Sequence, residues 1–298
     1  MQTAVHEHKT RTRFSEDGDR GMEPSATLSA KDFGRLSRFI YEKCGIKMPE
    51  VKKTMLEARL QKRLRSRGIR KFSDYCDFLF SSEGMEQELV PMIDMVTTNK
   101  TDFFREPEHF DYLFQRVLPD WCQRHQGPLA IWSAGCSSGE EPYTLAMVLS
   151  EFAETRPGFD FKILATDIST RVLDKAKNAV YGEALVDPVP MALRKKYLLR
   201  SKDRSSGLVR IVPELREKIS FRRLNFMDED FGLREQMDII FCRNVIIYFD
   251  RPTQEKLLQR FHRQLKPGGF IFMGHSETLN GLDVALTNVF PTVYRKMR

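Results

Sequence analysis

The stretch that decides the fold of this chain is Ala130-Ile131-Trp132-Ser133-Ala134-Gly135-Cys136-Ser137-Ser138-Gly139-Glu140-Glu141-Pro142-Tyr143-Thr144. An apolar run over residues 129–132 ends in small residues over 133–139, and an apolar-periodic segment over 142–152 follows. This order predicts a strand, a tight turn and a helix, which together form the first βα unit of an open parallel sheet. The turn would let backbone N–H groups approach a ligand closely, because glycine carries no Cβ atom.

Two acids stand where the predicted turn meets its helix. Glu140 and Glu141 would repel a polyphosphate, whose binding sites use bare backbone amides and a lysine at the helix start. Carboxylates there suit a positively charged ligand, such as the amino group and sulfonium of S-adenosylmethionine. The acids are equally well explained if they only favour the helix N-terminus while the glycines make the turn. The turn alone leaves both interpretations open.

Composition and charge limit the class of protein. The 298 residues are 41% hydrophobic and 30% charged, which is typical of a soluble protein of about two domains. No apolar run approaches the roughly 20 residues that span a bilayer, and no secretory h-region is visible. Five dispersed cysteines without metal-ligand spacing indicate reduced thiols, so we expect a cytoplasmic protein with no bound metal and no membrane insertion. The net charge of +7 indicates an acidic partner.

The first part of the chain is predicted to contain a leader and a helical domain. Residues 1–27 are polar and charged, which favours a disordered leader. Over 28–96 the apolar pattern is helical, with Ser29 as the predicted cap of a first helix and with later helices over 72–80 and 85–96.

A second helix, over 52–67 and ending at Gly68, is strongly basic. Only Glu57 offers an acidic partner within this helix. The helix is therefore either a solvated surface or a dock for an acidic partner, which would be a phosphate backbone or a carboxylate-rich helix. Most of its surface outside the apolar positions is made basic by Lys52, Arg59, Lys62, Arg63, Arg65 and Arg67.

Residues 97–128 are predicted to form a linker and a connecting helix between the helical domain and the sheet domain. Loops placed on rigid scaffolds often carry binding groups. Phe103 and Phe104 are better explained as hydrophobic anchors, whereas binding and structural roles both stay open for Asn99, Thr101 and Arg105. The linker begins Thr97-Thr98-Asn99-Lys100-Thr101-Asp102-Phe103-Phe104-Arg105-Glu106.

Polar residues follow the second and third predicted strands of the sheet. Asp167 follows the strand over 161–166, at the position where a carboxylate accepts hydrogen bonds from a ribose diol. Asn225 follows the strand over 219–224 and suits an adenine ring. A polar strand end beside a core phenylalanine explains Asn225 at least as well, so its role stays open.

The fourth predicted strand, over 237–242, runs into Arg243, Asn244 and Tyr248. Because the carboxyl ends of parallel strands line the ligand crevice of an open sheet, these side chains are predicted to point toward a cofactor or substrate. The turn at 135–139 is not G-x-G-x-x-G, and Gly-Lys-Ser/Thr is absent from the sequence, so nicotinamide and nucleoside triphosphate sites are disfavoured.

The βα pattern is interrupted between about residue 181 and residue 217, which predicts an inserted element with a small antiparallel hairpin. The pattern then resumes with a predicted helix over 253–265 and a strand over 270–273. A hairpin that ends in residues 289–294 is predicted to close the chain.

Three strings taken together are highly specific: Thr97-Thr98-Asn99…Thr101…Phe103-Phe104-Arg105-Glu106, Ser133-Ala134…Ser138-Gly139-Glu140-Glu141-Pro142-Tyr143 and Phe241-Cys242-Arg243-Asn244-Val245-Ile246-Ile247-Tyr248-Phe249. They resemble the chemotaxis receptor glutamate O-methyltransferases, the CheR family, and the resemblance extends from about residue 28 to the C-terminus. It implies an α/β fold, with a class I S-adenosylmethionine methyltransferase domain and its Rossmann-like sheet over 129–298. An N-terminal all-helical domain over 28–96 and a small antiparallel β-subdomain inserted at about 181–217 are implied as well.

The resemblance also implies roles for single residues. Arg105 and Tyr248 would be catalytic, flanking the transferred methyl group and orienting the acceptor carboxylate. Arg59, Arg63 and Arg65 would dock on the acidic methylation helix in the cytoplasmic domain of a transmembrane chemoreceptor. The cofactor contacts would be Asn99, Thr101, Arg105, Glu141, Asp167, Asn225, Phe226, Arg243 and Asn244.

A second receptor contact is implied by the inserted β-subdomain, which in the family can grip the C-terminal tail peptide of a receptor. Here the turn has Ser201 and Asp203 where tail-binding members carry glycines. Binding of a tail peptide therefore stays open.

The implied reaction is in-line transfer of a methyl group from S-adenosylmethionine to a glutamate carboxylate, which leaves S-adenosylhomocysteine and a glutamate methyl ester. A carboxylate with a pKa of roughly 4.3 is ionised at neutral pH, so positioning is required and a general base is not. One alternative is an RNA methyltransferase, favoured by the basic helix but lacking an Asn-Pro-Pro-aromatic stretch after residue 242. The other is a non-catalytic cofactor-binding scaffold, against which Arg105 and Tyr248 count. We expect no nucleic acid partner.

Overall fold

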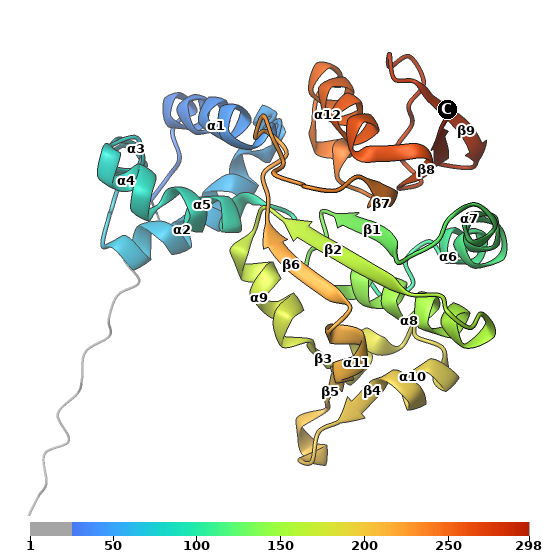
Figure 1. The fold of residues 1–298 in the computed structure, drawn as a ribbon. Helices are drawn as coiled ribbons and strands as arrows, with labels where there is room; N and C mark the ends of the chain where they lie inside the picture. Colours follow the sequence, from blue (N-terminus) through green and yellow to red (C-terminus); the bar gives the residue numbers. More distant parts are fainter. Residues whose placement is uncertain (1–25, 298) are drawn as a thin grey trace, which may run out of the picture.

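A computed structural model describes residues 26–297 of the chain (Figure 1). The predicted leader over 1–27 therefore lies outside the described residues, apart from Ala26 and Thr27. None of the helices within residues 26–297 is both long and apolar enough to cross a membrane.

The N-terminal part of the described chain is helical, as predicted. Ser29 caps the first helix by accepting a hydrogen bond from the backbone N–H of Asp32 at 3.0 Å, and Gly68 ends the second with a φ of 67°. The helix predicted over 85–96 is instead two helices that meet at Glu88, whose side chain is buried. The helical segments are α1 (Ala30–Cys44), η1 (Glu50–Lys52), α2 (Lys53–Arg67), α3 (Phe72–Leu79), α4 (Ser82–Gln87) and α5 (Leu89–Val96).

A seven-stranded sheet forms the centre of the second part, in the order β6-β2-β1-β7-β8-β10-β9. Strands β6, β2, β1, β7 and β8 run parallel, and β10 pairs antiparallel with β8 and with β9. The chain order reverses beside β1, and such a switch point is where open α/β sheets bind ligands. The strands are β1 (Leu129–Ala134), β2 (Phe161–Asp167), β6 (Ile219–Arg223), β7 (Met237–Cys242), β8 (Leu265–Met273), β9 (Leu286–Phe290) and β10 (Val293–Lys296).

The alternation of side chains along the buried strands assigns different helices to the two faces of the sheet. In β1, Leu129 and Ile131 belong to the core under α6–α8, whereas Ala130, Trp132 and Ala134 belong to the core under α12. Figure 1 shows α12 on one face of the sheet and α8 with α9 on the other. These segments are α6 (Glu108–Tyr112), the π-helical η2 (Leu113–Val117), α7 (Leu118–Arg124), α8 (Glu140–Thr155), α9 (Thr170–Asn178), η5 (Ile246–Tyr248) and α12 (Arg251–Gln264).

The predicted insertion is a three-stranded antiparallel sheet in the order β3-β5-β4. Strands β4 and β5 form the predicted hairpin, and β3 adds a strand that the sequence did not indicate. Figure 1 shows this small sheet below α8 and apart from the N-terminal helices. The α/β fold class with its inserted β-subdomain is thus confirmed. The segments are β3 (Val180–Gly182), η3 (Glu183–Val186), α10 (Met191–Tyr197), β4 (Leu198–Arg200), η4 (Arg204–Ser206), β5 (Leu208–Ile211) and α11 (Pro213–Arg216).

Candidate active site

A cleft of about 1100 Å³, counting the open volume at its mouth, lies at the carboxyl ends of β1, β2, β6 and β7. Every residue that the sequence analysis assigned to cofactor binding or catalysis lines this cleft. The N-terminal helical part closes one wall with Cys44, Ile46, Met48, Lys52 and Met55, which the sequence analysis missed. The predicted residues that line it are Asn99, Thr101, Arg105, Glu141, Asp167, Asn225, Phe226, Arg243, Asn244 and Tyr248.

The turn after β1 is held open by glycine and tied to the next strand. Gly135 has a φ of 88°, and a Cβ atom built there would lie 2.5 Å from Cγ2 of Val245, so a larger residue does not fit. The carboxylate of Asp167 accepts hydrogen bonds from the backbone N–H groups of Ser137 and Ser169, each at 2.9 Å. Each carboxylate oxygen can accept a further hydrogen bond, so the same group can still bind a ligand.

The two acids of the turn have different surroundings. Glu140 is buried and accepts hydrogen bonds from Oγ of Ser138 at 3.0 and 2.8 Å, and it does not line the cleft. Glu141 lines the cleft and accepts a hydrogen bond from Oγ of Ser133 at 2.7 Å. The geometry of Glu140 therefore fits a purely structural role at the helix start. The geometry of Glu141 fits a role in binding a positively charged ligand.

Arg243 lies beside Glu141, and both residues line the cleft. Its side chain is only 2% exposed, and its Nε atom is 3.5 Å from Oε2 of Glu141. Burial raises the pKa of Glu141, and the guanidinium of Arg243 opposes that shift. The guanidinium lies 5.3 Å from the ring centre of Phe110 and donates a hydrogen bond to the carbonyl of Arg105. Within the described residues, Nε and Nη1 of Arg243 are buried without a hydrogen-bond partner, and Nε lies 3.5 Å from carboxylate oxygens of both Glu106 and Glu141.

The two predicted catalytic residues approach the cleft from different elements. Arg105 comes from the linker, where its Nη1 donates a hydrogen bond to the carbonyl of Lys100 at 3.2 Å. Tyr248 ends η5, and its carbonyl accepts the backbone N–H of Lys47 at 3.0 Å. The ammonium of Lys52 lies 5.6 Å from the centre of the Tyr248 ring. Residues of the N-terminal part thus contact the residue predicted to orient the acceptor.

The side chain of Asn225 and the backbone carbonyl of Asn99, two predicted cofactor residues, also hold the walls of the cleft together. Asn225 donates from Nδ2 to the carbonyl of Lys43 at 2.7 Å and accepts the backbone N–H of Met227 at 3.0 Å. The carbonyl of Asn99 accepts a hydrogen bond from Oγ of Ser137 at 2.9 Å, which ties the linker to the turn after β1. Asn225 keeps one free N–H and one free lone pair, so both of its open roles are compatible with this geometry.

The buried carboxylate of Glu277 organises the segment after β7, and the sequence analysis missed it. It accepts four backbone N–H groups, those of Asn244, Val245, Ile246 and Gly274, at 2.6–2.9 Å. Burial raises the pKa of Glu277, and these four donors oppose the shift. The sequence contained a signal for Glu277, because it follows the predicted strand over 270–273 closely. The same kind of position had already identified Asp167, which follows the strand over 161–166.

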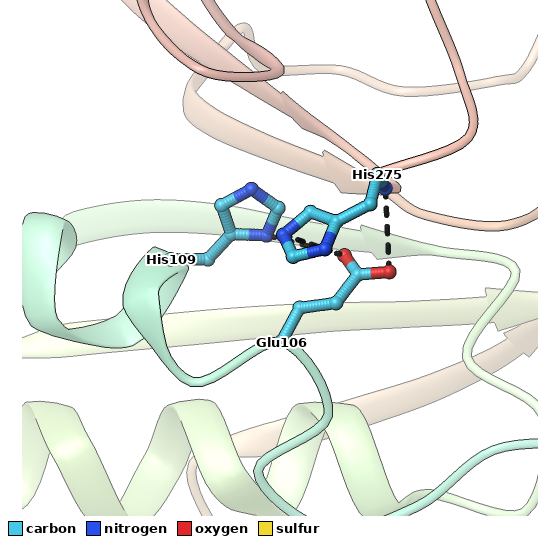
Figure 2. A group of neighbouring side chains, drawn as sticks. All are labelled: Glu106, His109 and His275. Atoms are coloured by element: carbon cyan, nitrogen blue, oxygen red, sulfur yellow. Dashed lines mark hydrogen bonds and ion pairs between the residues drawn. The ribbon is translucent and has the colours of Figure 1, made fainter.

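A cluster that was not predicted from the sequence lies beside Arg243. It consists of Glu106, His109 and His275. Figure 2 shows the three side chains pointing toward one another from the linker, the start of α6 and the loop after β8. Oε2 of Glu106 is 3.5 Å from Nδ1 of His109 and 4.0 Å from Nε2 of His275. Oε2 of Glu106 is also 3.5 Å from Nε of Arg243. The sequence signal was the Glu-x-x-His spacing at residues 106–109.

More of the arginines of the basic helix α2 are paired with acidic residues than the sequence predicted. Glu57 is the acidic residue within this helix, as the sequence indicated, but a second acid, Glu88, reaches the helix from the junction of α4 and α5. Glu88 binds Nη2 of Arg63 at 2.7 Å and Nε of Arg67 at 2.8 Å. Such partners come from tertiary packing, which the pattern of one helix does not reveal.

The three predicted docking residues therefore differ from one another, and none of them lines the cleft. Arg63 is paired with Glu88, and Arg59 donates from Nη1 to the carbonyl of Val96 at 2.6 Å, which anchors the linker. Arg65 is exposed on the surface. A docking role is thus easiest to reconcile with Arg65.

The chain is similar to known proteins over most of its length. Residues 31–97 match the family described as "CheR methyltransferase, all-alpha domain", and residues 99–295 match "CheR methyltransferase, SAM binding domain". A chemotaxis protein methyltransferase of Borreliella burgdorferi is 40% identical over 90% of this chain and 95% of its own length. The Escherichia coli chemotaxis protein methyltransferase is 40% identical, covering 92% and 93%. Chemotaxis protein methyltransferase 2 of Pseudomonas aeruginosa is 40% identical, covering 89% and 92%.

Proposed function

The chain belongs to the CheR family of S-adenosylmethionine-dependent methyltransferases, and we propose that its cleft joins this cofactor to a glutamate side chain of a chemotaxis receptor. The product is a glutamate methyl ester on the receptor. The observation that carries the proposal is that every predicted cofactor and catalytic residue lines one cleft. Neither the RNA methyltransferase nor the non-catalytic scaffold agrees with the relatives.

The polar groups of the cleft fit S-adenosylmethionine. Asp167 keeps acceptor capacity at the end of β2, where a ribose is expected. Glu141 and Arg243 offer one negative and one positive group, which suit the ammonium and the carboxylate of the methionine part. Nε and Nη1 of Arg243 are buried and lack a hydrogen-bond partner among residues 26–297, and a ligand carboxylate would satisfy them.

The bound cofactor supplies an electrophilic methyl group on a cationic sulfur. As the acceptor carboxylate forms its O–CH3 bond, the S–CH3 bond breaks and its electron pair stays on sulfur. Arg105 would hold the acceptor through charge-assisted hydrogen bonds, and the hydroxyl of Tyr248 would steer its second oxygen. Because the acceptor is ionised at neutral pH, these residues position it and no base has to remove a proton.

The receptor would meet the surface that carries Arg65. An exposed guanidinium on α2 is suited to an acidic receptor helix, since it can pair with carboxylates without losing an internal bond. Lys52, which lines the cleft beside Tyr248, adds positive charge close to the reacting carboxylate.

A receptor tail peptide would use a different part of the molecule. Strands β3 and β4 are the edges of the small sheet, and a peptide strand could pair with either of them. In the turn before β5, Asp203 accepts the backbone N–H of Ser205 at 3.0 Å, at a position where tail-binding members carry glycine. Calorimetric titration with a receptor tail peptide decides whether this edge is used.

The proposal is tested by incubating the protein with radiolabelled S-adenosylmethionine and receptor-bearing membranes. The expected result is label in the receptor that alkali releases as methanol, since methyl esters are base-labile. Receptor in which the modified glutamates are replaced by alanine is the control. Label that resists alkali, or that enters added RNA instead, would contradict the proposal.

A further inference from the structure

We propose that Glu106, His109 and His275 form a binding site for a divalent transition-metal ion of the Zn²⁺ class, next to the methyl-transfer cleft. The three residues come from three separate segments and converge in space (Figure 2). Their ligand atoms, one carboxylate oxygen and two imidazole nitrogens, all lie within 4.8 Å of one another. The site does not depend on the methyltransferase function proposed above.

The distances are close to those of a tetrahedral site. With bonds of about 2.0–2.1 Å, two ligand atoms of a tetrahedral zinc ion are about 3.4 Å apart. Oε2 of Glu106 lies 3.5 Å from Nδ1 of His109 and 4.0 Å from Nε2 of His275. Only His275 has to move inward, and its side chain is 47% exposed and therefore free to do so.

The two inner ligand atoms make no hydrogen bond in the described part of the chain, although Oε2 of Glu106 lies 3.5 Å from Nε of Arg243. Both atoms, Nδ1 of His109 and Oε2 of Glu106, are buried. Nε2 of His109 contacts Oγ1 of Thr292 at 2.9 Å, which orients the ring so that Nδ1 faces Glu106. Such an outer contact is the usual support of a metal-bound histidine.

Glu108, which contacts His275 but is outside the three-residue group, lies on the exposed side of the site. Oε1 of Glu108 lies 2.7 Å from Nε2 of His275, and both side chains are partly exposed. For an ion to bind Nε2 of His275, the ring must be neutral with its hydrogen on Nδ1, so any hydrogen between Nε2 and Glu108 passes to solvent or to Nδ1. Glu108 or a water molecule would then complete the coordination. The imidazole ligands favour zinc, cobalt or nickel over magnesium and calcium, which prefer oxygen.

Arg243 opposes a cation here and limits its affinity. Its Nε atom is 3.5 Å from Oε2 of Glu106, but it is equally close to Oε2 of Glu141. When Glu106 binds an ion, Arg243 therefore keeps Glu141 as an acidic partner. Because Arg105 directly precedes Glu106, an ion at this site would also fix the linker residue that faces the cleft.

The test uses the full chain, freed of metal with a chelator and titrated with Co²⁺. The expected result is a set of visible absorption bands typical of tetrahedral cobalt, which saturates at one ion per chain and disappears when Zn²⁺ is added. Zn²⁺ should also raise Tm by about 5 °C at a concentration near 100 times Kd. Mg²⁺ should produce no such shift in Tm.

The variant His275→Ala tests whether the ion binds at this site, because this exposed side chain can be removed without disturbing the fold. It should lose the cobalt bands and the Zn²⁺-dependent rise in Tm, whereas the matched control His262→Ala should keep both. Absence of cobalt bands in the wild-type chain would overturn the proposal. Bands that persist in His275→Ala would overturn it as well, since the ion would then be bound elsewhere.

Discussion

The carboxylate of Glu277 accepts the backbone N–H of Asn244 at 2.9 Å. Asn244 has a φ of 59°, a left-handed conformation that is unfavourable for most residues other than glycine. The same carboxylate binds the N–H groups of Val245 and Ile246, which lead into the turn that ends at Tyr248. Glu277 therefore holds Asn244 and Tyr248 in place without lining the cleft itself.

Glu277→Gln should lower both stability and turnover. An amide nitrogen would replace one carboxylate oxygen, and each oxygen now accepts two backbone N–H groups, so two buried donors would lose their acceptor. The expected loss is about 3 kcal/mol in the free energy of unfolding, measured with urea. Exposed Glu229 provides the control, since Glu229→Gln should change neither value. Equal stability of the two variants would contradict the role assigned to Glu277.

Tyr248→Phe should lower kcat more than it weakens cofactor binding. The ring would remain under the ammonium of Lys52 and the backbone bond to Lys47 would persist, so only the hydroxyl is lost. A hydrogen bond to a charged group is worth enough to reduce kcat between about 10- and 100-fold. Initial rates with receptor membranes give kcat, and calorimetry gives the affinity for S-adenosylhomocysteine. An unchanged kcat would remove Tyr248 from the reaction.

Asp167→Ala should weaken binding of S-adenosylhomocysteine by about 100-fold, because a buried ribose diol would lose its charged acceptor. Ser137 and Ser169 would also lose their acceptor, so Asp167→Asn, which keeps one oxygen, should fold better and still bind weakly. Asp174→Ala, an exposed change on α9, is the control. Calorimetry that finds intact affinity in the folded Asp167→Asn chain would refute the ribose assignment.

The positions of the cleft residues could be predicted from the sequence because of one property of parallel sheets. The carboxyl ends of parallel strands share an edge, so Asp167, Asn225 and Arg243, which each follow a predicted strand, had to lie near one another. The ends of single helices could also be predicted from the sequence. Ser29 accepts a backbone hydrogen bond at its helix start, and Gly68 takes the left-handed conformation at a helix end.

Features that depend on contacts between distant segments could not be predicted in this way. The helical wall of the cleft, including Cys44 and Met48, exists because one domain packs on another. Strand β8 begins at Leu265 rather than at the predicted residue 270, because Lys-Pro-Gly-Gly continues the strand through an irregular register instead of ending in a loop. No periodicity within these segments encodes their partners.

Arg65→Ala should change receptor binding but not stability, whereas Arg63→Ala should change stability. Arg65 is exposed, so its removal should raise KM for receptor membranes by about threefold and leave unfolding unchanged. Arg63 is bonded to the buried Glu88, so its removal should destabilise the chain. Arg156→Ala, an exposed change after α8, is the control for charge. Identical KM values for Arg65→Ala and Arg156→Ala would contradict docking through Arg65.

The cluster around Glu88 predicts a loss of stability in acid. Burial alone would raise the pKa of Glu88, but hydrogen bonds from Arg63, Arg67 and Tyr75 outweigh it and lower the pKa. A lowered pKa in the folded state means that this contribution is fully present above the unfolded-state pKa. It is lost as the pH falls below about 4.3 and through the lower folded-state value.

Glu88→Gln should therefore do two things. It should lower the free energy of unfolding at pH 7 by about 3 kcal/mol, because two arginines lose a buried anionic partner. It should also make the decline of stability below pH 5 shallower, since one carboxylate with a lowered pKa no longer takes up a proton on unfolding. Urea unfolding across this pH range measures both effects, with exposed Glu86→Gln as the control. If Glu88→Gln and the wild-type chain lose stability with the same slope in acid, Glu88 does not carry the pH dependence.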